Sequence, residues 1–181
     1  MIPSIKSIQS LLSYLNKNKA DADYYHKILE NLSLNITDLE PFTFYKQERY
    51  TRNLIHQTKH CELMTLCWLP GQETAIHDHN QAEGWMITVQ GEVTETTYPT
   101  TTSEQVNLMP IKSTTLSTGE LSYINDNLAY HSIKCNNNSP SITLHLYAPP
   151  IDWCYVFDNK TKTKKKRKLV FDTINGKHIS K

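Results

Sequence analysis

The sequence lacks several features that would set the protein apart from ordinary globular domains. It has no apolar run of membrane-spanning length, and its N-terminal stretch places Ser, Gln and Lys between the apolar residues, unlike the core of a signal peptide. We therefore expect a cytoplasmic protein with no membrane partner. The formal net charge of +1 shows no excess of one sign that would attract nucleic acid, so no nucleic-acid partner is expected either.

The cysteines lack the pairing that would indicate a disulfide framework or a redox motif. The chain has four of them, scattered along its length without a CxxC pair. At 181 residues the chain is long enough to bury a sizeable core without disulfide bonds. We expect free thiols, a single domain and a monomer.

The composition of the sequence and the spacing of its apolar residues change near Pro41. Before it, apolar residues recur at helical spacing, which predicts two short amphipathic helices within residues 1–40 that pack on the main body. After it, short segments rich in Thr, Val, Ile, Tyr and Trp alternate with turn residues, which predicts an all-β jelly-roll barrel with a C-terminal β extension over residues 41–181. The candidate strands are 53–57, 62–68, 74–79, 84–90, 92–98, 112–117, 121–124, 128–134 and 141–147.

A basic run at Lys160–Lys168 is the only stretch of low complexity. It contains no interleaved aromatic residues, and the rest of the chain does not extend it. A solvated turn or hairpin is therefore favoured over a patch that binds nucleic acid.

Histidines in the segment GQETAIHDHNQAEGWMITVQG are the first candidates for a metal site. His77 and His79 are two residues apart in a strand-like stretch, so both imidazoles project from one face while Asp78 points the other way. Neutral imidazole is the commonest metal ligand in proteins and suits Zn, Cu, Ni and Fe. An HxH pair alone is weak evidence, because surface and core histidines share this spacing. A third candidate, His131, follows turn residues and lies on a later predicted strand.

These segments resemble the two metal-binding stretches of the cupin family, which have the forms G-x5-H-x-H-x3,4-E-x6-G and G-x5-P-x-G-x2-H-x3-N. The family resemblance supports a jelly-roll barrel with a metal in its interior. The matching residues are Gly71, His77, His79 and Gly91 in the first stretch and, more loosely, Gly119, His131 and Asn136 in the second.

The chain departs from the cupin pattern at the glutamate ligand. Counted back from Gly91, the glutamate position falls on Gly84, while Glu83 lies one residue early and would turn to the opposite face. We therefore predict a site of three histidines without a carboxylate. Neutral ligands leave a divalent ion its full +2 charge, which favours an anionic ligand such as a thiolate and keeps positions open for O2.

Three longer segments resemble the cysteine dioxygenase family in particular, and together they cover most of residues 45–160. The resemblance implies that ferrous iron, Fe(2+), is held by the three histidines and that L-cysteine is oxidised by O2 to cysteine sulfinate. In that family the glutamate position holds either a cysteine crosslinked to a nearby tyrosine or a glycine, so Gly84 excludes a thioether to Tyr147. The segments are YTRNLI at Tyr50–Ile55, LCWLPGQETAIHDH at Leu66–His79 and SITLHLYAPPIDWCYVFD at Ser141–Asp158.

The resemblance also implies roles for individual side chains. Arg52, helped by the hydroxyl of Tyr50, would hold the substrate carboxylate, to which a planar guanidinium is suited. Thr143, His145 and Tyr147 alternate with leucines, so they share one strand face and can form a hydrogen-bond chain. In the family reading Tyr147 contacts substrate or oxygen, His145 fixes its phenol, and Thr143 stands where relatives often have Ser. Without the resemblance, a surface salt bridge for Arg52 and a satisfied barrel interior for the three strand residues would be the preferred explanations.

Several alternatives stay open at this point. Trp68 and Trp85 are expected to pack the barrel, although Trp68 could line a pocket. Cys154 resembles a family cysteine near the pocket entrance, and a buried small apolar residue is an equal alternative. One of the two proline bonds after Ala148 could be cis.

The substrate and the activity also have rivals. Related mercaptopropionate dioxygenases usually carry Gln at the position of Arg52, which favours L-cysteine here, with 3-mercaptopropionate and cysteamine as alternatives. A non-catalytic metal-binding cupin and a hydrolase or isomerase that uses Zn or Mn are further possibilities.

Overall fold

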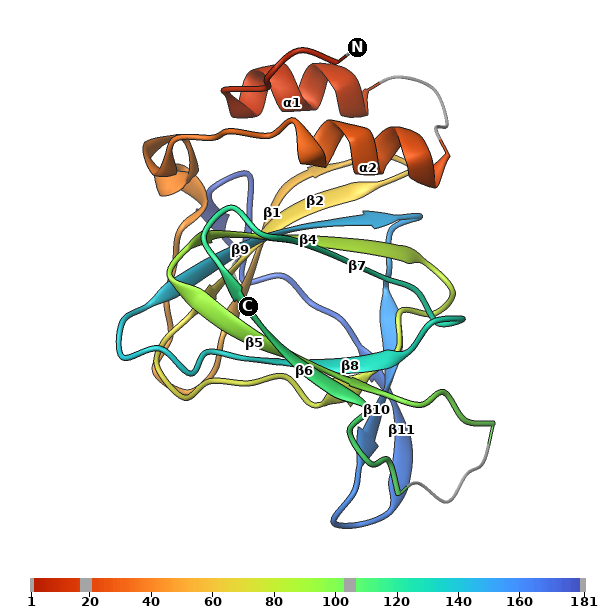
Figure 1. Cartoon of the computed structure of the whole chain (residues 1–181). Coiled ribbons are helices and arrows are strands. Elements are labelled where there is room, and N and C mark those ends of the chain that lie inside the picture. Colours follow the sequence, from red (N-terminus) through yellow and green to blue (C-terminus); the bar gives the residue numbers. More distant parts are fainter. Residues whose placement is uncertain (1, 17–20, 103–106, 180–181) are drawn as a thin grey trace.

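The computed structural model describes residues 2–16, 21–102 and 107–179. These residues form two α-helices, one 3-10 helix and thirteen strands, and the strands make two sheets that face each other as a barrel (Figure 1). The predicted all-β fold with a short helical N-terminal segment is confirmed. Across the described residues no helix is long and apolar enough to cross a membrane.

The two predicted N-terminal helices are present, and polar caps define where they begin. Ser7 accepts a hydrogen bond from the backbone N–H of Ser10, and Asp21 accepts one from Tyr24, which satisfies N–H groups that a first helical turn leaves free. The turn expected between them falls partly on residues 17–20, outside the described residues. The helices are α1 (Ile8–Leu15), α2 (Ala22–Glu30) and the 3-10 helix η1 (Ile36–Phe42).

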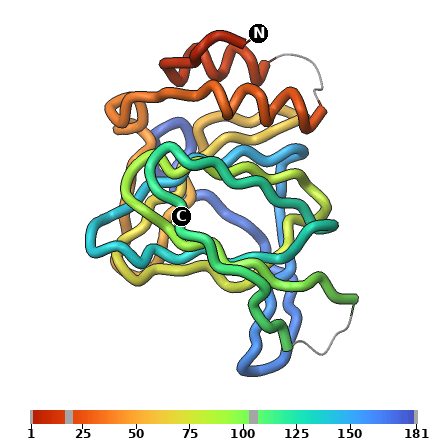
Figure 2. Tube along the Cα trace, viewed as in Figure 1, coloured from red at the N-terminus to blue at the C-terminus, as the bar shows by residue number. Residues whose placement is uncertain are grey.

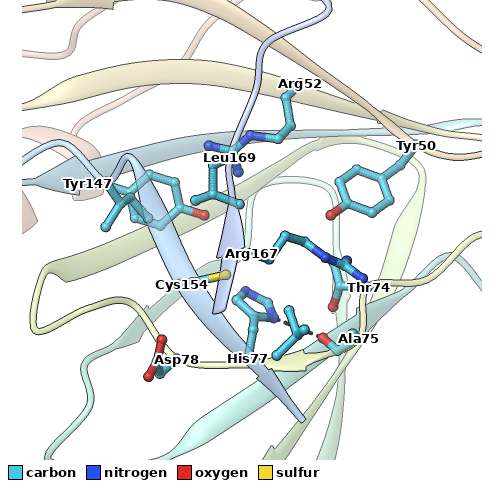
Figure 3. A pocket seen from close by; sticks show the side chains of 12 residues that line it. Tyr50, Arg52, Thr74, Ala75, His77, Asp78, Tyr147, Cys154, Arg167 and Leu169 are labelled. Carbon is cyan, nitrogen blue, oxygen red and sulfur yellow. Dashed lines mark hydrogen bonds between the residues drawn. The ribbon is translucent and has the colours of Figure 1, made fainter. Parts of the chain in front are cut away.

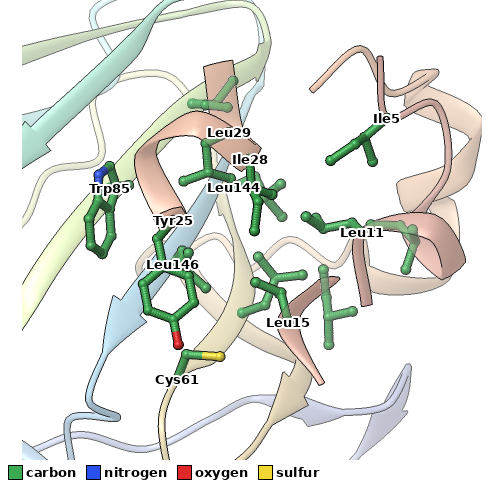
Figure 4. Close-up of a cluster of buried hydrophobic side chains, with 14 of the residues drawn as sticks. Ile5, Leu11, Leu15, Tyr25, Ile28, Leu29, Cys61, Trp85, Leu144 and Leu146 are labelled. Carbon is green, nitrogen blue, oxygen red and sulfur yellow. The ribbon is translucent and has the colours of Figure 1, made fainter. Parts of the chain in front are cut away.

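The larger sheet has seven strands in the order β13-β12-β1-β2-β9-β4-β7. Its outer face is covered by α1 and α2, whose buried side chains Leu11, Leu15 and Ile28 form one core with Leu144 and Leu146 of the sheet (Figure 4). Burying each such side chain contributes about 1.5–3 kcal/mol. The strands are β1 (Thr51–Gln57), β2 (Glu62–Trp68), β4 (Glu83–Gln90), β7 (Leu121–Ile124), β9 (Ser141–Ala148), β12 (Thr173–Ile174) and β13 (Lys177–His178).

The smaller sheet has six strands in the order β11-β10-β3-β8-β5-β6. Strand β3 stops at His77, although the sequence predicts a strand over 74–79. The chain leaves the sheet because Asn80 and Gln81 adopt φ angles of 50° and 66°, in the left-handed region that ends a strand. The strands are β3 (Ile76–His77), β5 (Glu92–Tyr98), β6 (Lys112–Ser117), β8 (Tyr130–Lys134), β10 (Trp153–Asp158) and β11 (Thr163–Lys168).

Strand β9 lies between β2 and β4 and carries residues to both faces of the larger sheet. His145 is opposite Met64 of β2 and Met86 of β4, and Tyr147 is opposite Gly84. Because side chains alternate along a strand, the polar residues of β9 face the barrel interior while its leucines face the helices.

Strands β10 and β11 form a ribbon that projects from the barrel, as the trace in Figure 2 shows. The predicted hairpin at the basic run is confirmed, but aromatic residues do interleave with it from the neighbouring strand. Lys164 lies 4.0 Å from the ring centroid of Tyr155, and Lys166 lies 3.6 Å from that of Trp153. The candidate strands predicted from the sequence do not include β10 or β11, but both lie in the region where a C-terminal β extension is expected. The bond between Ala148 and Pro149 is cis, one of the two expected possibilities.

Candidate metal centre and active site

Three histidines that are distant in sequence meet inside the barrel. His77 on β3 is directly opposite His131 on β8, and His79 follows β3 in the loop. One side-chain nitrogen from each lies within 4.8 Å of the others. The structure therefore brings the three predicted ligands together, close enough to share one ion.

Hydrogen bonds fix how two of these imidazoles are turned. Nδ1 of His77 donates to the carbonyl of Ala75 at 2.9 Å, and Nδ1 of His131 donates to Oε1 of Glu95 at 2.7 Å. Glu95 is also held by the hydroxyl of Ser122. A donor bond from Nδ1 leaves Nε2 unprotonated, so this nitrogen can offer its lone pair to a metal.

The third histidine is placed by its backbone. The N–H groups of His79 and Gln81 donate to the two carboxylate oxygens of Asp126 at 2.7 and 2.6 Å. Nδ1 of His79 is 3.6 Å from Asp126, too long for a good hydrogen bond. Asp126 thus holds the tight turn after His79, including the left-handed residues Asn80 and Gln81, without engaging the imidazole.

The histidine nitrogens that face the centre fit a cation. Nε2 of His79 and of His131 are buried and have no hydrogen-bond partner among the described residues, a costly arrangement unless a ligand completes it. Burial lowers the pKa of His79 to about 4 and holds the pKa of His77 well below its usual value, with the neighbouring histidines adding to the effect at His77. Both imidazoles are therefore neutral at pH 7, the form that binds metals.

No carboxylate belongs to this cluster within the described part of the chain. A Cβ atom added at Gly84 would lie 3.3 Å from Cε1 of Tyr147, so this position faces the site but carries no side chain. Glu83 turns away, as strand alternation predicts, and accepts hydrogen bonds from the hydroxyl of Tyr123 and from Asn125.

A chain of four side chains runs through the interior and ends at Tyr147. The indole N–H of Trp68 can only donate, and it donates to the hydroxyl oxygen of Thr143 at 2.9 Å. Thr143 then gives its own proton to Nε2 of His145 at 2.7 Å. His145 donates from Nδ1 to the phenol oxygen of Tyr147 at 3.0 Å. This arrangement gives an acceptor to the donors of Trp68, Thr143 and His145 and leaves the Tyr147 proton free for a ligand.

Burial keeps the members of this chain uncharged. It lowers the pKa of His145 well below its usual value, an effect to which the positive charge of Arg52 adds. It raises the pKa of the Tyr147 phenol, although Arg52 opposes the rise. Tyr147 is therefore a hydrogen-bond donor at neutral pH.

A small pocket, with a cavity volume of about 30 Å³, leads to His77 and Tyr147 and is lined by Tyr50 and Arg52 (Figure 3). Arg52 is only 8% exposed, and its Nε and Nη2 atoms have no hydrogen-bond partner in the described residues. A buried guanidinium with free N–H groups is complementary to a carboxylate. The ring of Tyr50 stacks on Trp68, with 4.6 Å between centroids, and this stacking places its hydroxyl beside the pocket.

Asp172 secures the strand that carries Arg52. Its carboxylate accepts the backbone N–H of Arg52 at 3.0 Å and the side chains of Arg49 and Lys46. Burial alone would raise the pKa of Asp172, but these donors outweigh it and lower the pKa to about 2. The buried carboxylate is therefore ionised and holds β1 to the C-terminal segment.

Sequence reasoning did not find four residues that shape the site. Glu95 orients the imidazole of His131, Asp126 holds the backbone at His79, Asp172 supports Arg52, and Arg167 of β11 lines the pocket. The sequence held one signal for Glu95. This acid shares a strand face with the apolar Val93, and an acidic residue on a buried face needs a partner. Cys154 lines the pocket and is also buried. It therefore fits both alternatives given for it, a cysteine near the pocket and a small buried apolar residue.

Comparisons with known proteins agree with this geometry. A family model described as Cysteine dioxygenase type I matches residues 3–160. Cysteine dioxygenase type 1 of Rattus norvegicus is 30% identical over 161 residues, which cover 88% of this chain and 80% of that protein. The Bos taurus protein of the same name is 31% identical over 151 residues, covering 82% of this chain and 76% of that protein.

Solved structures support the fold. The TT1209 protein from Thermus thermophilus aligns with a TM-score of 0.52 at 20% identity, covering 62% of this chain and 94% of that one. A Klebsiella pneumoniae protein with a double-stranded beta-helix domain aligns with a TM-score of 0.50 at 19% identity, covering 61% and 81%. This likeness confirms the predicted cupin-type barrel. With the family match over most of its length, the chain belongs to the cysteine dioxygenase type I family of cupin thiol dioxygenases.

Proposed function

We propose that the protein is an iron-dependent thiol dioxygenase that converts L-cysteine and O2 to cysteine sulfinate. The observation that carries the proposal is the meeting of unpartnered histidine nitrogens with a pocket that holds an unpartnered guanidinium. The histidine nitrogens fit a metal ion, and the guanidinium fits an anionic group on a small molecule in the pocket. Family membership supports this combination.

His77, His79 and His131 would hold the ferrous ion through neutral imidazoles. When bound, iron would supply the redox chemistry that adds both atoms of O2 to the thiol sulfur. The protein supplies a site without a carboxylate, so an anionic thiolate is a favoured ligand there. Glu95 would keep the imidazole of His131 in place, and Asp126 would hold the backbone at His79, through the contacts described above.

Arg52 would bind the carboxylate of L-cysteine and so orient the molecule in the pocket. Its Nε and Nη2 atoms are both free, which permits the bidentate geometry that a guanidinium forms with a carboxylate. Tyr50 lines the same pocket and would donate its hydroxyl proton to the same group. A substrate fixed in this way presents its sulfur in one orientation, which lowers the entropic part of the barrier.

Tyr147 would donate its free proton to the bound substrate or to oxygen. Its role depends on the direction of the hydrogen-bond chain that begins at Trp68 and passes through Thr143 and His145. A donor that is already oriented stabilises developing negative charge without reorganising during the reaction.

The proposal is tested with iron-reconstituted protein and three thiols in air: L-cysteine, 3-mercaptopropionate and cysteamine. We expect mass spectrometry to show a product two oxygen atoms heavier than L-cysteine. Replacing His79 with Ala should abolish iron loading and product formation, while His26→Ala, on the surface of α2, should change neither. An unoxidised thiol in every reaction of the loaded protein would refute the proposal.

The carboxylate contact has its own test. Arg52→Lys keeps the positive charge but loses the planar pair of N–H donors. KM for L-cysteine should therefore rise about tenfold or more, in line with the loss of a charge-assisted hydrogen bond. KM for cysteamine, which has no carboxylate, should change little. Preferential turnover of 3-mercaptopropionate would move the proposal to that thiol, and an unchanged KM for both carboxylated thiols would remove Arg52 from the substrate site.

A further inference from the structure

Arg167 adds a second guanidinium to the pocket. It lies on β11 opposite Cys154 of β10, and both residues line the pocket together with Arg52 and Tyr50. Figure 3 shows its side chain extending into the area between Tyr50 and Thr74. Unlike the buried Arg52, Arg167 is exposed to solvent and therefore marks the open end.

No lysine of the basic ribbon lines the pocket among the described residues. Lys164 and Lys166 lie over the rings of Tyr155 and Trp153, on the face of β11 opposite to Arg167. None of the described acidic residues forms an ion pair with Arg167. Its charge is therefore directed to the pocket and is not neutralised by a neighbour.

The charge balance of the pocket is positive even before a metal is counted. Arg52 and Arg167 both line it, and the one acidic residue in the described lining, Asp78, already accepts the backbone N–H of Tyr155 at 2.7 Å. Burial raises the pKa of Tyr50, and the charges of Arg52 and Arg167 both oppose that rise. The field of Arg167 thus reaches the groups that surround a substrate.

We propose that Arg167 is a specificity-determining residue that selects thiols by charge at the mouth of the pocket. It attracts thiols that carry a carboxylate and disfavours thiols that carry an ammonium group alone. This inference rests on the proposed thiol dioxygenase function and goes beyond it, because Arg52 and Tyr50 recognise the carboxylate only after the substrate has entered. Charges at the mouth of a cleft concentrate ligands of the opposite sign and accelerate their association.

Three thiols of different charge test the proposal. At neutral pH and with the thiol protonated, 3-mercaptopropionate carries one negative charge, L-cysteine is zwitterionic and cysteamine carries one positive charge. We would measure the Kd of each by anaerobic calorimetry with the iron-loaded protein, and kcat/KM in air, at low and high ionic strength. The variants are Arg167→Gln and Arg167→Lys, with Lys168→Gln as the control, because Lys168 is adjacent on β11 and absent from the pocket lining.

The expected result is an effect ordered by charge. At low salt, Arg167→Gln should weaken binding of 3-mercaptopropionate about tenfold, within the range of electrostatic steering, weaken L-cysteine less, and leave cysteamine unchanged or bound more tightly. Arg167→Lys should restore most of the loss. High salt should reduce the difference between wild type and variant, since an exposed charge is screened. The control should stay close to wild type, and kcat should change little in any variant.

The outcomes separate this proposal from the proposed function. Thiol oxidation with the same Kd values in Arg167→Gln and wild type would overturn the role of Arg167 and leave the dioxygenase assignment standing. An equal loss for all three thiols, or an equal effect of Lys168→Gln, would also overturn it. Charge-ordered binding that depends on Arg167 without any oxidised product would support the role of Arg167 and refute the dioxygenase activity.

Discussion

The two faces of strand β9 differ sharply in what their residues do. The outer face carries Leu144 and Leu146, which are almost fully buried against α1 and α2. The inner face carries Thr143, His145 and Tyr147, which are equally buried but are joined by hydrogen bonds and end at the candidate metal centre. Burial alone therefore does not distinguish a structural residue from a functional one. The difference is that the leucines make all their contacts within the protein, whereas the hydrogen-bond chain of the inner face ends at a Tyr147 hydroxyl whose proton is free for a ligand.

The largest expected effect tests the inner face. Tyr147→Phe keeps the ring and removes the one donor that the hydrogen-bond chain directs at the pocket. We expect kcat for L-cysteine to fall about 100-fold, as for the loss of an oriented donor to a transition state. The melting temperature should change by only a few degrees, since one hydrogen bond contributes about 1 kcal/mol. Steady-state kinetics and calorimetry check both values, and a fully active variant would break the functional contrast between the faces.

The second prediction concerns the support of the metal ligands. Glu95→Gln removes the charge that orients His131, so the affinity for Fe(II) should fall about 10- to 100-fold, the usual cost of losing a hydrogen-bond partner of a ligand. Anaerobic metal titration measures this. Glu92→Gln is the control, because Glu92 is on the same strand and outside the histidine network. Equal affinities for the two variants would show that the Glu95 contact does not position the histidine.

The third prediction tests the outer face. Leu144→Ala opens a cavity between the sheet and the helices, so the free energy of unfolding should fall by about 2–5 kcal/mol. The melting temperature should fall by about 10 °C for a domain of this size. At 25 °C the folded variant should keep its kcat, because the side chain points away from the pocket. A tenfold loss of kcat in the folded state would show that the two faces are coupled.

The smallest effect is the response to acid at the edge of the larger sheet. The pKa of Asp172 is lowered from 3.8 to about 2 in the folded chain, so its ionised form stabilises the protein above about pH 4. That contribution is lost as the pH falls from about 4 to about 2. Thermal unfolding between pH 2 and pH 6 should show a shallower acid loss in Asp172→Asn than in wild type. Parallel curves would mean that Asp172 does not contribute to acid sensitivity.

Strand alternation made much of the site predictable. The spacing of Thr143, His145 and Tyr147 predicts a common face, and the same rule predicts that Glu83 turns away from the site. Both hold because alternation is a property of the extended backbone and needs no knowledge of neighbouring strands. The single candidate strand over 74–79 is longer than β3, because a turn of non-glycine residues with positive φ has no reliable local signal.

The sequence by itself determined the types of ligand, the common strand face of Thr143, His145 and Tyr147 and, through its family resemblance, the candidate residues. Only the tertiary structure decided the partners: Glu95 beneath His131, Asp126 beneath the turn after His79, and Arg167 at the mouth of the pocket. The physical reason is that local geometry sets the direction of a side chain, whereas the register between distant strands follows from the packing of the whole barrel.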